Sequence, residues 1–207
     1  ECLVVELNDK KHIARALQAL GKTYCVDGDT LSLSAYERVC MLSGGRKVVS
    51  LPGLMQKVRS IKTLEEIALI QKAIKITERA LRATIEHLRP GMTEIAVATF
   101  FEDLCREQGA DGLAFPTIVA AGHNGSQPHA QPSKKKIRKG ELVTIDCGAR
   151  VDGYHADITR TVSLGKPAPQ LKAMYDAVFE AQSVGLASIA PGVPAAQVDE
   201  VCRAVIE

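Results

Sequence analysis

The stretch IDCGARVDGYHADITRT, residues 145–161, decides the fold of this chain. A short apolar run rich in β-branched side chains, residues 142–145, leads into it. After the turn signal Asp152-Gly153, residues 154–162 alternate between polar and apolar side chains. Two such runs joined by a Gly-containing turn predict a β-hairpin.

Two aspartates in this hairpin, Asp146 and Asp157, stand eleven positions apart. A loop centred on Val151-Asp152 makes them direct cross-strand neighbours, and like charges in that position are destabilising. A bound cation is the simplest reason for such a pair, although a lone Asp-Gly hairpin more often uses its aspartates for the turn and a strand end. Thr159, on the same face as Asp157, is a candidate for orienting a carboxylate. Carboxylates joined by imidazole suit Mn, Co or Zn, and carboxylates alone suit Mg or Ca.

A histidine-bearing loop precedes the hairpin. His129 lies in GHNGSQPHAQPS, residues 122–133, which is too rich in Gly, Pro, Ser and Asn to be core. A lone loop histidine is usually a surface residue. His129 follows Pro128, which restricts the chain, and stands seventeen positions before Asp146. It could reach over the hairpin as a hydrogen-bond donor or proton carrier.

The composition bounds the class of protein. With 207 residues, 46% of them apolar and 24% charged, the chain is long enough for one large or two small globular domains. A net charge of +2 and the scarcity of aromatic residues argue against a nucleic-acid partner. No apolar run approaches membrane-spanning length. The six cysteines form no C-x-x-C pair, so we expect reduced thiols in a cytoplasmic protein, with Cys147 pointing into the core.

Two regions differ in their pattern. Residues 1–56 alternate strand-like and helix-like pieces, which predicts part of an α/β domain. Its expected elements are strands at Leu3–Val5, Tyr24–Val26 and Lys47–Leu51 and helices at Lys10–Leu20 and Ser34–Leu42. Residues 57–207 open with a long helix that ends at Pro90-Gly91, and a helix capped by Thr93 follows. The first of these helices has an expected apolar stripe interrupted at Thr77, made of Ile67, Ile70, Ile74, Leu81, Ile85 and Leu88.

The second region contains an internal repeat. The segments LRPGM, residues 88–92, and IAPGV, residues 189–193, are 101 positions apart, and the helices that follow them share an apolar phase. Both copies therefore predict a helix, a Pro-Gly break and a second helix. The first copy continues into strands, whereas the second ends at Glu207, so we expect a further set of strands beyond this residue.

Residues 57–161 resemble the Xaa-Pro peptidases, aminopeptidase P and prolidase, of the "pita-bread" metallopeptidase family. The resemblance rests on RSIKTLEEI at 59–67, on FPTIVAAG at 115–122 with Pro128-His129, and on IDCG at 145–148 with GYHADITRT at 153–161. It implies an α+β fold, namely the first half of a pita-bread domain, preceded by part of an α/β N-terminal domain.

The resemblance also implies a chemistry. Asp146 would bind one of two divalent ions, usually manganese, with cobalt or zinc possible, and Asp157 would bridge both. His129 would steady the substrate, and a hydroxide shared by the metals would attack the bond before a proline at the second position of a peptide. The family's remaining His and Glu ligands would lie beyond Glu207, so residues 1–207 alone are expected to bind metal weakly and to be inactive. The intact protein would be a homodimer.

Other interpretations remain open. Within the family, methionine aminopeptidase fits less well, because DITRT and the preceding domain suit the proline enzymes, and the metal-free creatinase branch needs other ligand residues. From another class, a non-catalytic pita-bread module that binds a peptide or protein is the main alternative. No G-x-S-x-G, P-loop or H-E-x-x-H motif occurs, which argues against serine hydrolases, P-loop NTPases and zincins.

Overall fold

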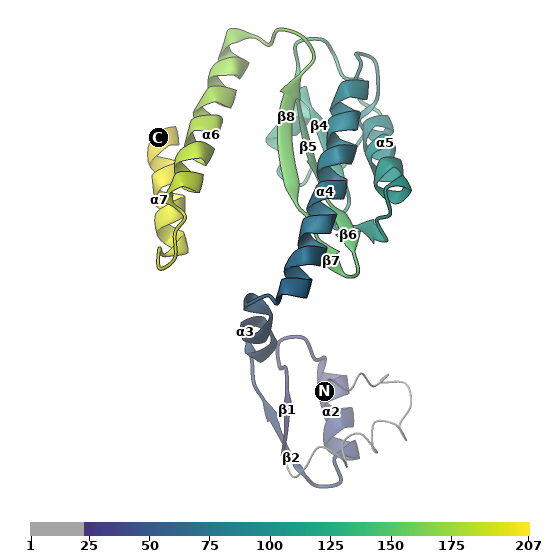
Figure 1. Cartoon of the computed structure of the whole chain (residues 1–207), viewed down its shortest axis with the longest axis vertical. Coiled ribbons are helices and arrows are strands. Elements are labelled where there is room, and N and C mark those ends of the chain that lie inside the picture. Colours follow the sequence, from purple (N-terminus) through teal and green to yellow (C-terminus); the bar gives the residue numbers. More distant parts are fainter. Residues whose placement is uncertain (1–22) are drawn as a thin grey trace. The chain divides into compact units, whose positions relative to one another are not determined.

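A computed structural model describes residues 23–207, and the chain divides into two compact units between Thr63 and Leu64 (Figure 1). The boundary expected from the sequence, between residues 56 and 57, falls within the short helix α3 (Leu54–Ser60). The expected elements at Leu3–Val5 and Lys10–Leu20 lie outside the described residues. Within residues 23–207, no helix has the length and apolar character needed to cross a lipid bilayer.

The first unit contains a parallel strand pair joined through a helix. β1 (Thr23–Val26) and β2 (Lys47–Ser50) are parallel, and α2 (Leu33–Leu42) connects them. Ser32 caps α2 by accepting a hydrogen bond of 3.3 Å from the Ala35 N–H. A parallel pair needs such a crossover, so the α/β character expected for this region is present.

The second unit is built from two small antiparallel sheets and four helices. The sheet that carries the acidic stretch has the strand order β4-β5-β8, and the other has the order β3-β6-β7. This segregation of antiparallel strands and helices confirms the predicted α+β class. The elements are α4 (Leu64–His87), α5 (Glu94–Glu107), β3 (Gly112–Leu113), β4 (Ile118–Ala121), the 3-10 helix η1 (Gly122–Ser126), β5 (Leu142–Cys147), β6 (Ala149–Val151), β7 (Tyr154–His155), β8 (Ile158–Ser163), α6 (Pro169–Ser188) and α7 (Ala195–Ile206).

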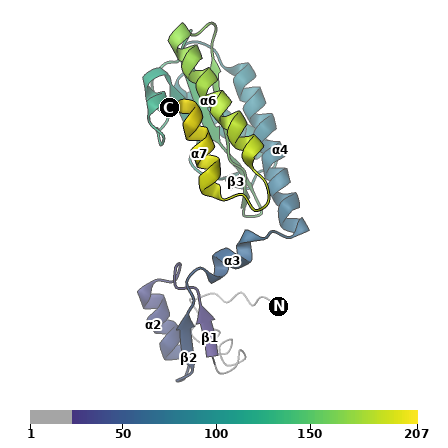
Figure 2. The same cartoon turned by 90° about the vertical axis from the view of Figure 1, so that its left-hand side faces the viewer.

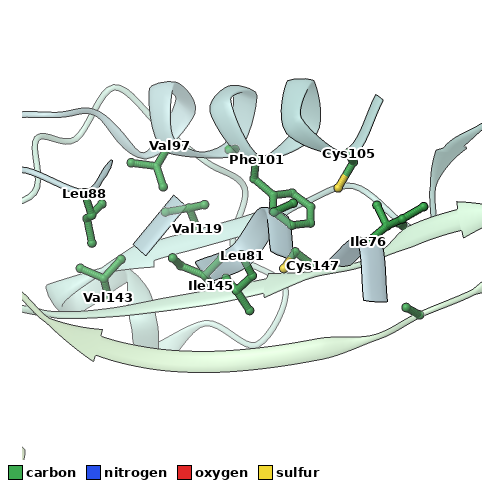
Figure 3. Close-up of a cluster of buried hydrophobic side chains, with 14 of the residues drawn as sticks. Ile76, Leu81, Leu88, Val97, Phe101, Cys105, Val119, Val143, Ile145 and Cys147 are labelled. Carbon is green, nitrogen blue, oxygen red and sulfur yellow. The ribbon is translucent and has the colours of Figure 1, made fainter. Parts of the chain in front are cut away.

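The core lies between β5 and the helices α4 and α5 (Figure 3). Alternation along β5 turns Val143, Ile145 and Cys147 to this side, and all three are completely buried. Phe101 of α5 is also completely buried in the same cluster. Burial of each such large side chain contributes roughly 1.5–3 kcal/mol, which fixes the face that β5 turns inward. The opposite face of β5 therefore carries Asp146.

The buried face of α4 includes most of the expected stripe and extends beyond it. Leu81 and Leu88 are buried, and Ile74 and Ile85 pack against the core. Ile67 is 39% exposed, whereas Ala73, Thr77, Ala80 and Thr84 are buried. Small side chains on this face let the helix backbone approach the strands closely. Thr77 was expected to interrupt the apolar stripe, but it lies at the centre of the buried face. This is possible because its hydroxyl makes two hydrogen bonds. Its Oγ1 accepts the Ala149 N–H at 2.9 Å and donates to the Ala73 carbonyl at 2.9 Å.

The predicted repeat is present in the backbone. The N–H groups of Leu88 and Met92 each donate to the carbonyl three residues earlier, at 3.3 Å. Ile189 and Val193, 101 positions later, do the same at 3.3 and 3.1 Å. The glycine of each Pro-Gly step has a positive φ, 92° and 88°. Both segments thus form a helix pair with the same junction, α4–α5 (Figure 1) and α6–α7 (Figure 2).

The two helix pairs differ in what they bury. At equivalent positions, Ala73 and Thr77 of α4 are completely buried, whereas Met174 and Val178 of α6 are 64% and 60% exposed. Phe179 is 57% exposed beside them. The second helix pair therefore presents apolar side chains on the face that the first pair turns toward a sheet.

Candidate metal centre

The hairpin forms around the predicted Asp152-Gly153 turn. Both turn residues have a positive φ, 48° and 79°, as a two-residue type I′ loop requires. Because the loop is centred between these residues, Asp146 pairs with Thr159 across β5 and β8. The predicted direct pairing of Asp146 with Asp157 is therefore wrong by two residues. That prediction assumed a loop centred one residue earlier in the chain. When the centre of a hairpin loop moves by one residue, the cross-strand partner of every residue moves by two positions.

The two aspartates nevertheless lie on one face, since a shift of two residues keeps the side of a strand. Thr159 Oγ1 donates to Asp146 Oδ1 at 2.7 Å, a short bond of the kind carboxylates accept. Burial, the negative charge of Asp146 and a hydrogen bond to that carboxyl raise the pKa of Asp157. The structure thus brings Asp146, Asp157 and Thr159 together, and the carboxyl groups are close enough to influence each other's protonation.

A glycine holds the second aspartate in place. A Cβ at Gly148 would overlap the carbonyl oxygen of Ala156. The chain can pass this close only because the side chain is absent, and the Ala156 N–H then bonds to the Ala149 carbonyl at 3.0 Å. Ala156 is buried and Asp157 follows it directly. Sequence reasoning assigned no role to Gly148, although a glycine between two strands is the signal for such a close approach.

The face that carries the aspartates is polar and partly open. Two residues from Asp146, the hydroxyls of Thr144 and Thr161 are hydrogen-bonded at 3.0 Å. η1 begins the histidine loop over this face, because a Cβ at Gly125 would lie 3.9 Å from Thr144 Oγ1. His129 follows in an exposed turn. The loop and the carboxylate pair therefore belong to the same side of the sheet.

The residues present fit part of a divalent-metal site. Asp146 and Asp157 supply hard oxygen donors on an open face, which suits a divalent cation. Across residues 23–207, no group of three or more His, Cys, Asp or Glu side chains is arranged to hold a metal, so His129 does not complete a ligand set with the aspartates. Two carboxylates are fewer ligands than the four or more that such an ion takes. The metal-ligand and catalytic roles of these residues stay predictions.

Cys147 takes no part in this face. It lies on the buried side of β5, as predicted, and is completely inaccessible. Burial raises the pKa of its thiol, with smaller contributions from Cys105 and from the charges of the two aspartates. The protonated thiol is a poor metal ligand, so Cys147 serves the core.

Comparison with protein families gives the class. The family model described as metallopeptidase family M24 matches residues 68–207, which is most of the chain. The chain belongs to this family. It has the α+β architecture of about half of the prolidase and aminopeptidase P structures, which have the pita-bread fold.

Named relatives and solved structures agree with this assignment. The chain is 40% identical over 175 residues to the uncharacterized peptidase YqhT of Bacillus subtilis, and 37% identical over 186 residues to an Xaa-Pro dipeptidase of Pyrococcus furiosus. These matches cover 84% and 90% of this chain, but 50% and 53% of the relatives. The chain thus spans about half the length of these curated relatives.

Two solved structures show the same relation. An X-Pro aminopeptidase from Thermotoga maritima MSB8 matches with a TM-score of 0.89 at 36% identity, covering 98% of this chain and 58% of that protein. The prolidase from Pyrococcus furiosus matches with a TM-score of 0.85 at 35% identity, covering all of this chain and 60% of that protein.

Proposed function

We propose that the chain supplies half of the active site of a metal-dependent peptidase that cleaves the bond before a proline at the second position of a peptide. The observation that carries this proposal is the carboxylate pair formed by Asp146 of β5 and Asp157, which directly precedes β8 and is hydrogen-bonded to Asp146. Thr159 of β8 donates a hydrogen bond of 2.7 Å to Asp146. The similarity to proteins named Xaa-Pro dipeptidase and X-Pro aminopeptidase supports the choice of substrate.

Each residue has a proposed role. Asp146 and Asp157 would hold divalent ions, manganese by preference and cobalt or zinc as alternatives. Bound divalent ions supply Lewis acidity and lower the pKa of water. Thr159 keeps one oxygen of Asp146 directed by its hydrogen bond. His129, on the loop that begins over the same face, donates a hydrogen bond to the substrate oxygen as negative charge develops there.

The whole protein needs more than these residues. Because the described residues bring only two carboxylates together, we propose that further His and Glu ligands complete the two-metal site. We also propose that the whole protein is a cytoplasmic homodimer that acts on peptides and binds neither nucleic acid nor membrane.

Metal binding tests the half-site. Titration of residues 1–207 with Mn²⁺, followed by isothermal calorimetry and by the EPR signal of free Mn²⁺, should give weak binding, with a Kd on the order of 10⁻⁴–10⁻³ M. Asp146→Asn and Asp157→Asn should each abolish it. Asp152→Asn is the matched control, because it removes the same charge from the turn of the same hairpin, where Asn also tolerates a positive φ. Equal binding by all three variants would contradict the site.

Turnover tests the reaction. The whole protein with Mn²⁺ should hydrolyse a peptide with proline at the second position and leave the same peptide with alanine there intact. Residues 1–207 alone should show no turnover. Xaa-Pro cleavage by residues 1–207 would show that the half-site proposal is wrong.

A further inference from the structure

A completely buried carboxylate lies in the first turn of α5. Glu94 has no accessible surface, and both of its oxygens accept hydrogen bonds. Oε1 accepts the Ala121 N–H at 2.8 Å and Asn124 Nδ2 at 2.9 Å. Oε2 accepts the Ser133 N–H at 3.0 Å and the Ser133 hydroxyl at 2.6 Å. One side chain thus satisfies donors from three places in the chain.

These three places enclose the histidine loop. Ala121 ends β4, Asn124 lies in η1 and Ser133 ends the loop, so Glu94 joins its beginning, its first turn and its end. The backbone strengthens the junction, because the Ile95 N–H donates to the Ser133 carbonyl at 3.2 Å. His129 lies between the joined points, exposed and four residues before Ser133.

Neutral hydrogen-bond donors, and no cation, stabilise the negative charge of Glu94 in the part of the chain that the structure describes. Burial by itself raises its pKa, but the hydrogen bonds from Ser133, Ala121 and Asn124 outweigh burial and lower it. Among the described residues, no Lys, Arg or His forms an ion pair with this carboxylate. The N-terminus of α5 adds the favourable end of a helix dipole. An ionised acceptor can match four donors at once, which a neutral side chain of this size cannot do.

The repeat separates this role from helix formation. Glu94 corresponds, 101 positions later, to Ala195, the first residue of α7. α7 forms after the same Pro-Gly junction without a carboxylate there. The helix pair therefore does not require Glu94, whose hydrogen-bond partners lie at the ends and in the first turn of the histidine loop.

We propose that Glu94 is a positioning residue: it fixes the loop of residues 122–132 on the polar face of β5 and so sets the place of His129. The proposal rests on the proposed function for the use of His129, but the fixing of the loop can be tested without it. Glu94 acts through the loop and does not touch the substrate.

Amide hydrogen exchange on the full 207-residue chain tests the fixing of the loop. In Glu94→Gln, the amide N–H₂ group of Gln faces groups that are themselves hydrogen-bond donors, so the loop loses acceptors. The exchange rates of Ala121, Ser133 and residues 122–132 should rise about ten-fold or more, while the rates of residues 97–105 of α5 should stay within about two-fold of the original. Glu107→Gln is the matched control, since Glu107 is exposed on the same helix. Unchanged loop exchange, or an equal rise across the whole second unit, would overturn the proposal.

Rescue gives the second readout. In Glu94→Gln with Asn124→Asp, the carboxylate and the carboxamide exchange places, and residue 124 can accept from the new Nε2. The double variant should recover part of the loop protection, and the NMR signals of the His129 ring, broadened in Glu94→Gln, should sharpen again. A double variant as unprotected as the single one would count against the proposal.

Kinetics of the whole protein separate the two proposals. Glu94→Gln should lower kcat more than it raises KM, and should add little to the loss caused by His129→Ala. If His129→Ala is fully active, the proposed role of His129 fails, while exchange in the 207-residue chain still decides whether Glu94 fixes the loop.

Discussion

Replacing Thr77 by Val should destabilise the second unit through one lost hydrogen-bond acceptor. Val has nearly the shape of Thr, so the packing against β6 is kept. The Ala149 N–H, which bonds to Thr77 Oγ1 at 2.9 Å, would lose its partner inside the core. An unpaired buried donor costs about 1–3 kcal/mol, and we expect about 2 kcal/mol here because both residues are completely buried.

Thr84→Val is the matched control for this prediction. Thr84 lies two turns further along the same face of α4 and is equally buried, but its hydroxyl bonds only to the Ala80 carbonyl, at 2.8 Å. That carbonyl keeps its helical partner when the hydroxyl is removed, so the expected change is about 0.5 kcal/mol or less.

Urea unfolding followed by far-UV circular dichroism measures the difference, since the chain has no Trp to report by fluorescence. With a slope of about 2 kcal/mol/M, Thr77→Val should lower the midpoint by about 1 M and Thr84→Val by less than about 0.3 M. Amide exchange at Ala149 should accelerate in the first variant only. Equal midpoints for the two variants would refute the assignment of Thr77 as the tie between α4 and β6.

Two further predictions concern the site. Thr159→Val should weaken Mn²⁺ binding by roughly 3–10-fold in calorimetry, because Asp146 loses its orienting hydrogen bond. Thr161→Val is the control: it breaks only the bond to Thr144 and should leave the affinity within about two-fold, and equal losses in both variants would contradict the role of Thr159. The second concerns pH. The hydrogen bonds that Glu94 accepts lower its pKa in the folded state, so its carboxylate contributes stability above its ordinary pKa, and this stability is lost as the pH falls through the lowered value. Protection of residues 121–133 should therefore decrease when the pH falls below the ordinary range of a glutamate, and Glu94→Gln should show no such step.

Local signals in the sequence predicted much of the fold. Thr93 caps α5 as expected and accepts a hydrogen bond of 3.1 Å from the Ala96 N–H. A turn forms at Asp152-Gly153, as these two residue types predicted. These features depend on neighbouring residues only. The register of β5 and β8 was missed because it depends on which pair of residues occupies the turn centre, and an error of one residue there moves every partner by two.

Tertiary contacts account for the rest. The predicted stripe of α4 missed the small buried residues beside it, because Ala and Thr carry little hydrophobic signal, although small side chains are what close packing on a sheet requires. The sequence gives no local signal for the role of Glu94, since its partners are 27 to 39 positions away. Asp146 and Asp157 were placed on one face correctly, because side-chain alternation survives an error of two residues in register.

The exposed row on α6 affects how the chain behaves in solution. Met174, Val178 and Phe179 are each more than half exposed and lie within about two turns of one helix. Contiguous apolar surface of this kind promotes self-association as the protein concentration rises. Colloidal stability, rather than the strength of the core, therefore sets the concentration range for titrations of residues 1–207, and light scattering should accompany each of them.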